Sequence, residues 1–158
     1  MSRRTLSSNP ALATISGFTN LRNISGALTI NANSALAVAS IASLVSVQAL
    51  TVTSNTALVN ISFAALYFLE SLNVNSNNAN LNHVEFPLVT STTGAVFVSQ
   101  CGSANFSRLI RANPIVSYSC NSGLGNNYLL QNAVICIPCA AGTFGNGIKR
   151  SLSHLIDR

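Results

Sequence analysis

Apolar and polar residues alternate along this chain in a pattern that repeats about every 22 residues. Three triplets read apolar, polar, apolar, and each starts 22 residues after the one before (50 − 28 and 72 − 50): Leu28-Thr29-Ile30, Leu50-Thr51-Val52 and Leu72-Asn73-Val74. A period of two residues is typical of a strand with one buried face. Weaker copies at residues 96–98 and 116–118 continue the pattern, and Leu6 with Asn9 marks a truncated first copy. The sequence therefore predicts one strand in each of about five coils between residues 5 and 120.

The length of the repeat favours a β-solenoid. Two packed helices need more than about thirty residues per repeat, whereas one strand with two short extended or turn segments fits into about 20–24 residues. A single coil cannot bury its apolar side, but stacked coils share one core. We therefore predict an all-β parallel β-helix in which corresponding residues stack in two interior columns: Leu28, Leu50, Leu72 and Val96 in one, and Ile30, Val52, Val74 and Val98 in the other.

An asparagine follows each triplet at a fixed distance. Asn33, Asn55 and Asn77 each come three residues after the last residue of their triplet. Asparagine suits a tight corner because its amide bonds nearby backbone groups and because it tolerates left-handed backbone angles. We expect the three amides to form a structural ladder at one corner of the coil; the alternative is that they supply surface polarity only.

The repeat resembles a known family. The phrase Ile24-Ser25-Gly26-Ala27-Leu28-Thr29-Ile30, followed by Asn33 and Leu36, resembles the repeat of receptor L-domains, which are related to leucine-rich repeats. Phe86-Pro87-Leu88 is similar to the F-P-x-L corner of fungal cell-wall and receptor members of that group. The resemblance covers roughly residues 5–120, and the chain departs from strict leucine-rich repeats by one extra residue before the final leucine. It implies a right-handed β-helix used for extracellular recognition.

A second resemblance lies near the C-terminal end. Cys136-Ile137-Pro138-Cys139-Ala140-Ala141-Gly142-Thr143-Phe144-Gly145 is similar to the start of an ephrin-receptor-like cysteine-rich repeat, which recurs in extracellular stalks. Residues 147–158 then lose this pattern and become charged. We expect a receptor L-domain-like solenoid over residues 1–120. Over residues 121–158 we expect an irregular tail, made of a loop at Gly123–Asn127, a truncated cysteine-rich repeat and a charged end.

Composition narrows the classes of function. Charged residues make up 7% of the chain, against about 25% in a typical soluble domain, which excludes a coiled coil, a charged disordered tail and a nucleic-acid-binding arm. The net charge of +5 comes from eight basic and three acidic residues, and most of the basic ones lie near the chain ends. No basic stripe interleaved with aromatics is present to follow a phosphate backbone, so we expect no nucleic-acid partner.

Residues 35–52 are apolar enough to raise the alternative of a membrane span. Three serines and Gln48 dilute the run, and the segment fits the repeat on both sides. No aromatic or basic cluster flanks it, as the ends of a span would require. We therefore expect a buried repeat and no membrane span within this chain. No secretory signal is visible at the start, because Arg3 and Arg4 precede no continuous apolar stretch.

Four cysteines leave three interpretations open. A thioredoxin-type redox pair at Cys136 and Cys139 would need a helix starting at the first cysteine, and a zinc site would need a second close pair or histidine partners. The third interpretation is structural disulfides in an oxidising compartment. Cys101 and Cys120 stand on adjacent predicted coils about 4.8 Å apart, within the α-carbon separation that a disulfide accepts. We expect that bridge, and we expect Cys136 and Cys139 to be unpaired or joined to each other.

Three glycosylation sequons suit the same extracellular or cell-surface location, at Asn23, Asn60 and Asn105. Catalytic residues, cofactors and metal ligands are not expected. The acids Glu70, Glu85 and Asp157 are scattered along the chain. Only Glu85 has a possible partner nearby: His83 lies two residues before it, so the two side chains share a face if the chain is extended there. We interpret that pair as the solvated edge of a coil.

These observations favour a non-enzymatic extracellular recognition or adhesion module, part of a surface protein that binds a protein or glycan ligand. Its binding face would carry the outward residues of the strands: Thr29, Thr51, Asn73 and Phe97, with Asn31, Thr53, Asn75 and Ser99 beside them. The alternative is an ice- or polysaccharide-binding solenoid, because rows of Thr and Asn present regular hydroxyls and amides. Asn73 and Phe97 interrupt the threonine row, which disfavours ice. A polysaccharide lyase or esterase is disfavoured because the chain lacks clustered charges.

Overall fold

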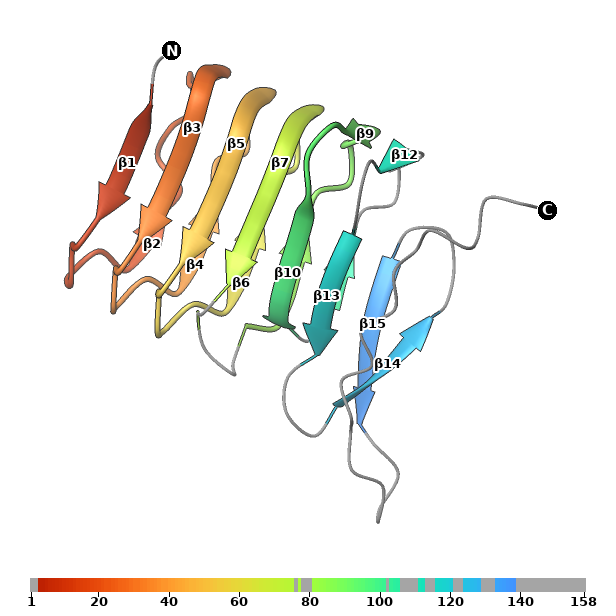
Figure 1. Ribbon diagram of the computed structural model, residues 1–158. Coiled ribbons are helices and arrows are strands. Elements are labelled where there is room, and N and C mark those ends of the chain that lie inside the picture. The colour runs from red at the N-terminus through yellow and green to blue at the C-terminus, as the bar shows by residue number, and fades with distance from the viewer. Residues whose placement is uncertain are drawn as a thin grey trace.

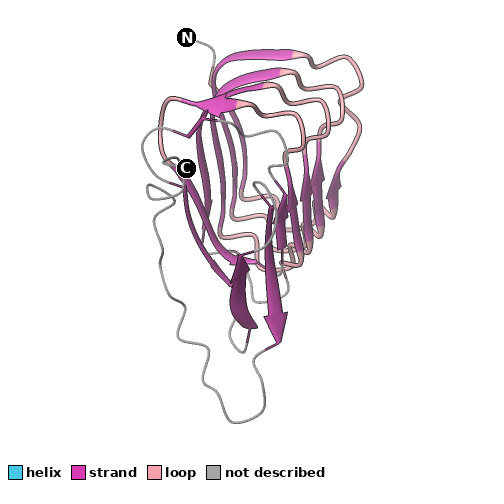
Figure 2. Cartoon of the chain, turned by 90° about the vertical axis from the view of Figure 1, so that its right-hand side faces the viewer, coloured by secondary structure: helices cyan, strands magenta, loops and turns pink. Residues whose placement is uncertain are grey.

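The computed structural model describes residues 3–75, 77 and 81–99 in full and, beyond residue 99, the backbone of the strands that lie between residues 100 and 138. The described residues form strands, turns and loops and contain no helix. Figure 1 shows the strands of one sheet side by side with shorter strands behind them, and Figure 2, turned by 90°, shows successive coils one behind another. The all-β solenoid expected from the repeat is confirmed.

Two sheets make up the walls of the solenoid. The first has six strands in the order β1-β3-β5-β7-β10-β13, and every neighbouring pair is parallel. Its strands are β1 (Arg4–Ser7), β3 (Asn23–Asn31), β5 (Ser46–Thr53), β7 (Phe68–Asn75), β10 (Val96–Cys101) and β13 (Val116–Cys120). The second has seven strands in the order β14-β15-β11-β8-β6-β4-β2. Its strands are β2 (Thr14–Ile15), β4 (Val38–Ser40), β6 (Asn60–Ser62), β8 (His83–Glu85), β11 (Ser103–Asn105), β14 (Leu124–Tyr128) and β15 (Ala133–Pro138). A short pair, β9 (Ser91–Thr92) and β12 (Arg111–Ala112), forms a third, parallel sheet.

The solenoid has about four turns, whereas the sequence predicts about five. Each coil places one strand in the first sheet and the next in the second, as in β3 and β4 or β5 and β6. The fifth repeat still adds β13 to the first sheet. The chain then reverses direction, because β15 pairs antiparallel with both β11 and β14, and parallel stacking stops there.

The two predicted interior columns are confirmed by the strand register. Leu28 pairs with Leu50, Leu50 with Leu72, and Leu72 with Val96. The second column is Ile30, Val52, Val74 and Val98, and all eight side chains are at most 2% exposed. The hydrophobic core is therefore continuous from coil to coil, as a solenoid requires.

Tight turns close the short sides of each coil. In these turns a backbone N–H donates to the carbonyl three residues earlier, from Leu36 to Asn33 and from Leu44 to Ile41, each at 3.1 Å. Phe63 and Phe86 begin equivalent turns in consecutive coils, and their buried rings stack with centroids 5.6 Å apart and planes 4° apart. Stacking along the axis thus extends from the strands to the corners.

An asparagine ladder lies at one corner, where the sequence places it. The Oδ1 atom of Asn55 accepts from the backbone N–H and from the Nδ2 of Asn33, both at 3.1 Å, and Asn77 does the same for Asn55 at 3.1 and 3.2 Å. Asn33 and Asn55 are fully buried and Asn77 is 9% exposed. Asn9 continues the ladder into the first coil by donating to Asn33 Oδ1. The amides therefore bond backbone as well as each other.

The left-handed backbone angle at this corner falls on a different residue from the one predicted. Ser8, Ala32 and Ser54, each one residue before a ladder asparagine, have φ values of 56°, 54° and 57°. The described ladder asparagines have no positive φ. Asparagine is selected here for its amide, and the strain of a left-handed angle is carried by the small residue before it.

The C-terminal tail is more regular than the sequence predicts. Strands β14 and β15 form an antiparallel pair, so the expected loop at Gly123–Asn127 is wrong for residues 124–127. Val134, Ile135 and Ile137 are β-branched, which favours a strand, and β15 finds a partner in β11. Cys139 and the charged end lie outside the described residues.

The apolar run at residues 35–52 is a buried repeat. It forms a turn, strand β4 and most of β5, and Leu36, Ala39 and Leu44 within it are 0% exposed. In the part of the chain that the structure describes, no helix has the length and apolar character needed to cross a membrane.

Candidate functional site

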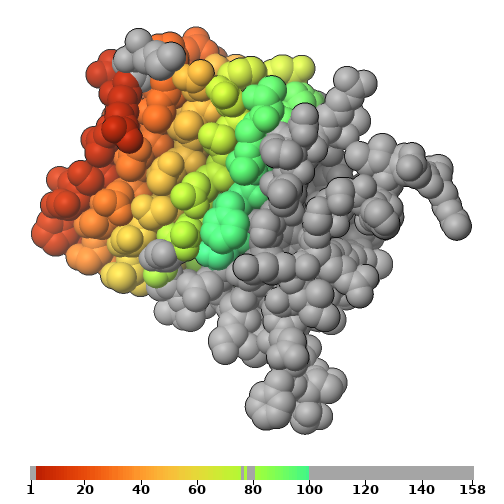
Figure 3. Space-filling model, in the orientation of Figure 1, coloured from red at the N-terminus to blue at the C-terminus, as the bar shows by residue number. Residues whose placement is uncertain are grey.

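The candidate binding face is the outer side of the first sheet. In the first outer row (Thr29, Thr51, Asn73 and Phe97), each residue pairs with the next by strand register. The second outer row (Asn31, Thr53, Asn75 and Ser99) lies two residues further along each strand. Neighbouring strands are about 4.8 Å apart, so both rows run along the solenoid axis. Figure 3 shows this face as parallel stripes of side chains, one for each strand from β1 to β10.

The second outer row is tied together by its own hydrogen bonds. Thr53 Oγ1 donates to Asn31 Oδ1 at 3.1 Å, and Ser99 Oγ donates to Asn75 Oδ1 at 3.4 Å. Ser99 is only 9% exposed, so little of its side chain is accessible to a ligand. Its hydroxyl forms a hydrogen bond to Asn75 in the neighbouring coil. This row stabilises the stack more than it offers groups to a ligand.

The first outer row keeps its polar groups available. Thr29 and Thr51 are half-buried and Asn73 is exposed. Among the described residues, no group forms a hydrogen bond to the side chains of these three. Their hydroxyl and amide groups are held in register by the strands but remain unpaired within the described structure, which is what a ligand-binding row requires.

A column of small outward residues lies beside the first outer row, on the other side of the inward Leu28, Leu50 and Leu72. Ala27, Ala49 and Ser71 pair with one another by register, and Ala95 continues the column through its carbonyl, which accepts from Leu72 N–H at 3.0 Å. These residues recur immediately before the inward Leu28, Leu50, Leu72 and Val96. That recurrence is the signal by which the sequence could have revealed them.

A bulge lies on the N-terminal side of this column. In β5, Gln48 and Ala49 are consecutive outward residues between the buried Val47 and Leu50, so the strict alternation is broken. Strand β3 has 9 residues against 8 in β5, and the register shifts between Ile24 and Ala27. A bulge bends the strand and redirects side chains. Here the irregularity ends before Ala27, and from that residue on the register is regular and aligns the small side chains across the sheet.

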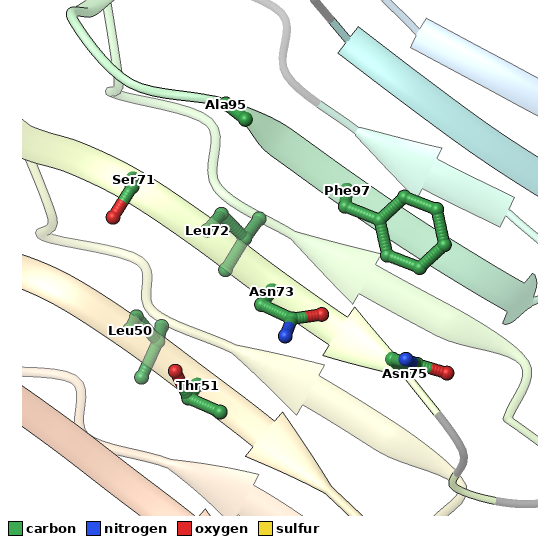
Figure 4. Close-up of a pocket in the computed structure, with 8 residues that line it drawn as sticks. All are labelled: Leu50, Thr51, Ser71, Leu72, Asn73, Asn75, Ala95 and Phe97. Atoms are coloured by element: carbon green, nitrogen blue, oxygen red, sulfur yellow. The ribbon is translucent and has the colours of Figure 1, made fainter.

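Two shallow hollows lie along this column and share Ser71. The first, of about 360 Å³, is lined by residues of β5, β7 and β10 and is drawn in Figure 4: Leu50, Thr51, Ser71, Leu72, Asn73, Asn75, Ala95 and Phe97. The second, of about 390 Å³, is lined by Arg3, Gly26, Ala27, Gln48, Ala49, Glu70 and Ser71. Because they share Ser71, we treat the two hollows as one furrow that extends across β3, β5, β7 and the start of β10. We call it the axial furrow.

The segment that leads into β10 passes close to β7, and this approach requires a glycine. A Cβ atom at Gly94 would lie 3.0 Å from the Ser71 Cβ and 3.1 Å from the Glu70 carbonyl oxygen, which accepts the Gly94 N–H. We expect Gly94→Ala to lower the free energy of unfolding by about 1–3 kcal/mol through overpacking. Gly17→Ala is the matched control, because nothing lies within 4 Å of its added Cβ, and we expect it to change stability by less than about 1 kcal/mol. Urea unfolding midpoints compare the two, and equal losses would contradict the close approach.

The two hollows differ in charge. No described residue that lines the first hollow is charged, whereas Glu70 and Arg3 both line the second. Phe68, 51% exposed on β7, lies on the same face but lines neither hollow. The first hollow is therefore a neutral site with one aromatic residue, Phe97.

The other candidate residues lie away from this face. His83 and Glu85 are both exposed on the outer side of β8 in the second sheet, flanking the buried Val84. Of the sequons, Asn23 is exposed at the start of β3, while Asn60 is half-buried in β6 and its Oδ1 atom is buried without a hydrogen-bond partner among the described residues. Asn105 lies in β11. Asn23 is the described sequon best placed for a glycan.

The backbone places two of the cysteines opposite each other. Cys101 in β10 and Cys120 in β13 are register partners after a shift in the pairing, a separation that suits a disulfide. Cys136 lies within strand β15 opposite Asn126. A thioredoxin-type site needs a helix that starts at its first cysteine, so the strand at Cys136 argues against that interpretation.

We predict a Cys101–Cys120 disulfide. It would close a loop of about twenty residues and stabilise the fold by about 3 kcal/mol, chiefly by restricting the unfolded chain. Thiols are counted under denaturing, non-reducing conditions on protein made in an oxidising secretory host. Two or fewer free thiols are expected. Four free thiols would refute the bridge and the extracellular location that it supports.

Comparison of the chain with protein-family models, with curated proteins and with solved structures finds no match. The resemblances to receptor L-domains and to ephrin-receptor-like repeats therefore stay expectations from the sequence. The candidate face itself therefore supplies the evidence for a function.

Proposed function

We propose that this protein is a non-enzymatic recognition or adhesion module of the extracellular space or cell surface, and that it binds its ligand through the first outer row and the axial furrow. The observation that carries the proposal is that Thr29, Thr51 and Asn73 are aligned by register and leave their polar groups unpaired among the described residues. No nucleic-acid partner is proposed.

The physical advantage of such a face is preorganisation. Binding costs free energy when side chains and loops must be ordered. Here the groups stand on strands that are paired on both sides, since β3, β5 and β7 are interior strands of the first sheet. Short Thr and Asn side chains also have few rotamers to lose. A ligand therefore meets groups that are already in place.

A variant that blocks the face with a long charged side chain tests the proposal. Thr51→Arg places a long cationic side chain at the centre of the first outer row, while Ser40→Arg makes the same change on a half-buried outward residue of β4 in the second sheet. Both proteins are applied to an array that carries extracellular-matrix proteins and glycans. We expect Thr51→Arg to weaken binding at least about tenfold, and Ser40→Arg to leave it nearly unchanged. Equal losses, or no binding by the unmodified protein to any spot, would refute the proposal.

Ice binding is the second candidate. Register aligns Thr5, Thr29 and Thr51 in one row at a spacing of about 4.8 Å, which favours a repeating hydroxyl array. Asn73 and Phe97 end that array. Thermal hysteresis of the purified protein separates the candidates, and clear activity would favour ice over the recognition module.

A further inference from the structure

We infer that the axial furrow binds a neutral oligosaccharide whose chain lies along the solenoid axis, with one sugar ring stacked on Phe97. This inference rests on the proposed function and names the class of its ligand. Four features of the furrow support it: its direction, the pairing of its strands, its polar groups and its aromatic residue.

The furrow has the direction and size of a site for an extended chain. Its small-residue floor crosses β3, β5, β7 and β10, with the two hollows of about 360 and 390 Å³ joined at Ser71. Volumes of about 300–1,000 Å³ are typical of small-molecule sites. A chain along the axis meets a new strand about every 4.8 Å, a spacing close to the length of one sugar unit.

The pairing of the strands disfavours an extended peptide. Peptides that bind to sheets commonly add as a strand at an open edge, where backbone groups are unpaired. Strands β3, β5, β7 and β10 each have a parallel neighbour on both sides, so the furrow offers no open edge. A ligand there must be recognised by side chains that stand on the sheet.

Those side chains match the hydroxyl groups of sugars. Thr51 and Ser71 each carry a hydroxyl, and Asn73 and Gln48 each carry an amide. Hydroxyls and amides can both donate and accept, as sugar hydroxyls also do. An anionic polymer would need several cations to balance its charge. In the described lining of the two hollows Arg3 is the one cation, and Glu70 lines the same hollow as Arg3. The chemistry therefore favours an uncharged chain.

The ring of Phe97 supplies a flat surface on which a sugar ring can stack. Figure 4 shows its ring lying broad face outward over β10, beside Asn73 and Asn75. An aromatic face carries partial negative charge, which suits the C–H groups on the apolar face of a pyranose ring. The neighbouring Asn73 amide can then reach the hydroxyls at the edge of that ring. An aromatic face beside neutral hydrogen-bonding groups is the arrangement that a sugar requires.

Titration followed by NMR tests the inference on the full chain. Four neutral hexasaccharides serve as probes: chitohexaose, cellohexaose, laminarihexaose and mannohexaose. We expect at least one to shift the amide resonances of Ser71, Asn73 and Ala95. Phe97→Ala should weaken that binding at least about tenfold, Phe97→Tyr should keep it within about threefold, and Phe68→Ala should leave it unchanged because Phe68 lines neither hollow.

The outcomes separate this inference from the proposed function. No shift with any hexasaccharide, shifts confined to the second sheet, or equal losses for Phe97→Ala and Phe68→Ala would each overturn the oligosaccharide site. If Thr51→Arg then still abolishes binding to a matrix protein on the array, the face remains a recognition surface with a protein ligand. Shift mapping uses the unmodified protein, so it tests the site even if Phe97→Ala fails to fold.

Discussion

Replacing Leu50 by aspartate is expected to unfold the protein, whereas the same replacement at the next residue, Thr51, should be tolerated. Leu50 is 1% exposed and stacks between Leu28 and Leu72. An aspartate there would bury an unpaired charge at a cost of several kcal/mol, against a total stability of about 5–15 kcal/mol for a typical domain. The damage would extend beyond one coil because each coil relies on its neighbours for its core.

Thr51→Asp is the matched control because it adds the same carboxylate to the same strand. Thr51 is half-buried on the outer side, where the new charge stays in contact with water. We expect it to change the free energy of unfolding by no more than about 1 kcal/mol, the range of strand propensities. Far-UV circular dichroism and urea unfolding of both variants provide the measurement. Equal loss of structure in the two would contradict the inward–outward alternation.

The interior of the solenoid could be predicted because two independent periods agree there. Alternation by two residues fixes which side chains of a strand point inward, and the 22-residue step fixes which of them stack. Leu28 and Leu50 satisfy both, so their register followed from the sequence. Asn33 and Asn55 satisfy the longer period and lie three residues beyond a strand triplet, which placed the ladder at a corner.

The binding face was predicted less completely, because its shape depends on side-chain size and packing as well as on where the alternation breaks. Gln48 and Ala49 both point outward, and nothing in a Gln-Ala pair distinguishes a bulge from ordinary alternation. The axial furrow was missed because alternation places Ala27, Ala49 and Ser71 on the outer side but does not show the hollows beside such small side chains. The pattern also placed Ser99 next to Asn75, but the hydrogen bond and the burial of Ser99 depend on packing that a single strand does not reveal.

The asparagine ladder gives the second large effect, which is expected from Asn55→Leu. The side chain of Asn55 is fully buried and donates through Nδ2 to the carbonyls of Ile30 at 3.1 Å and Thr53 at 2.9 Å. Its Oδ1 accepts from the backbone N–H of Asn33 at 3.1 Å. Leucine has nearly the same size but no polar atom, so these partners lose a hydrogen bond inside the corner. Each buried group left unsatisfied costs about 1–3 kcal/mol, and we expect a total loss of about 3–6 kcal/mol.

Asn31→Ala separates the ladder from the general effect of losing an asparagine. Asn31 is half-buried on the outer face, and among the described residues its side chain accepts one hydrogen bond, from Thr53 Oγ1. Thr53 is also half-buried, so water can replace that partner and the loss should stay below about 1 kcal/mol. Urea unfolding of both variants at one temperature gives the comparison. If Asn55→Leu lowers the free energy of unfolding no more than Asn31→Ala does, the ladder does not stabilise the stack of coils. The two core columns alone would then account for the stacking.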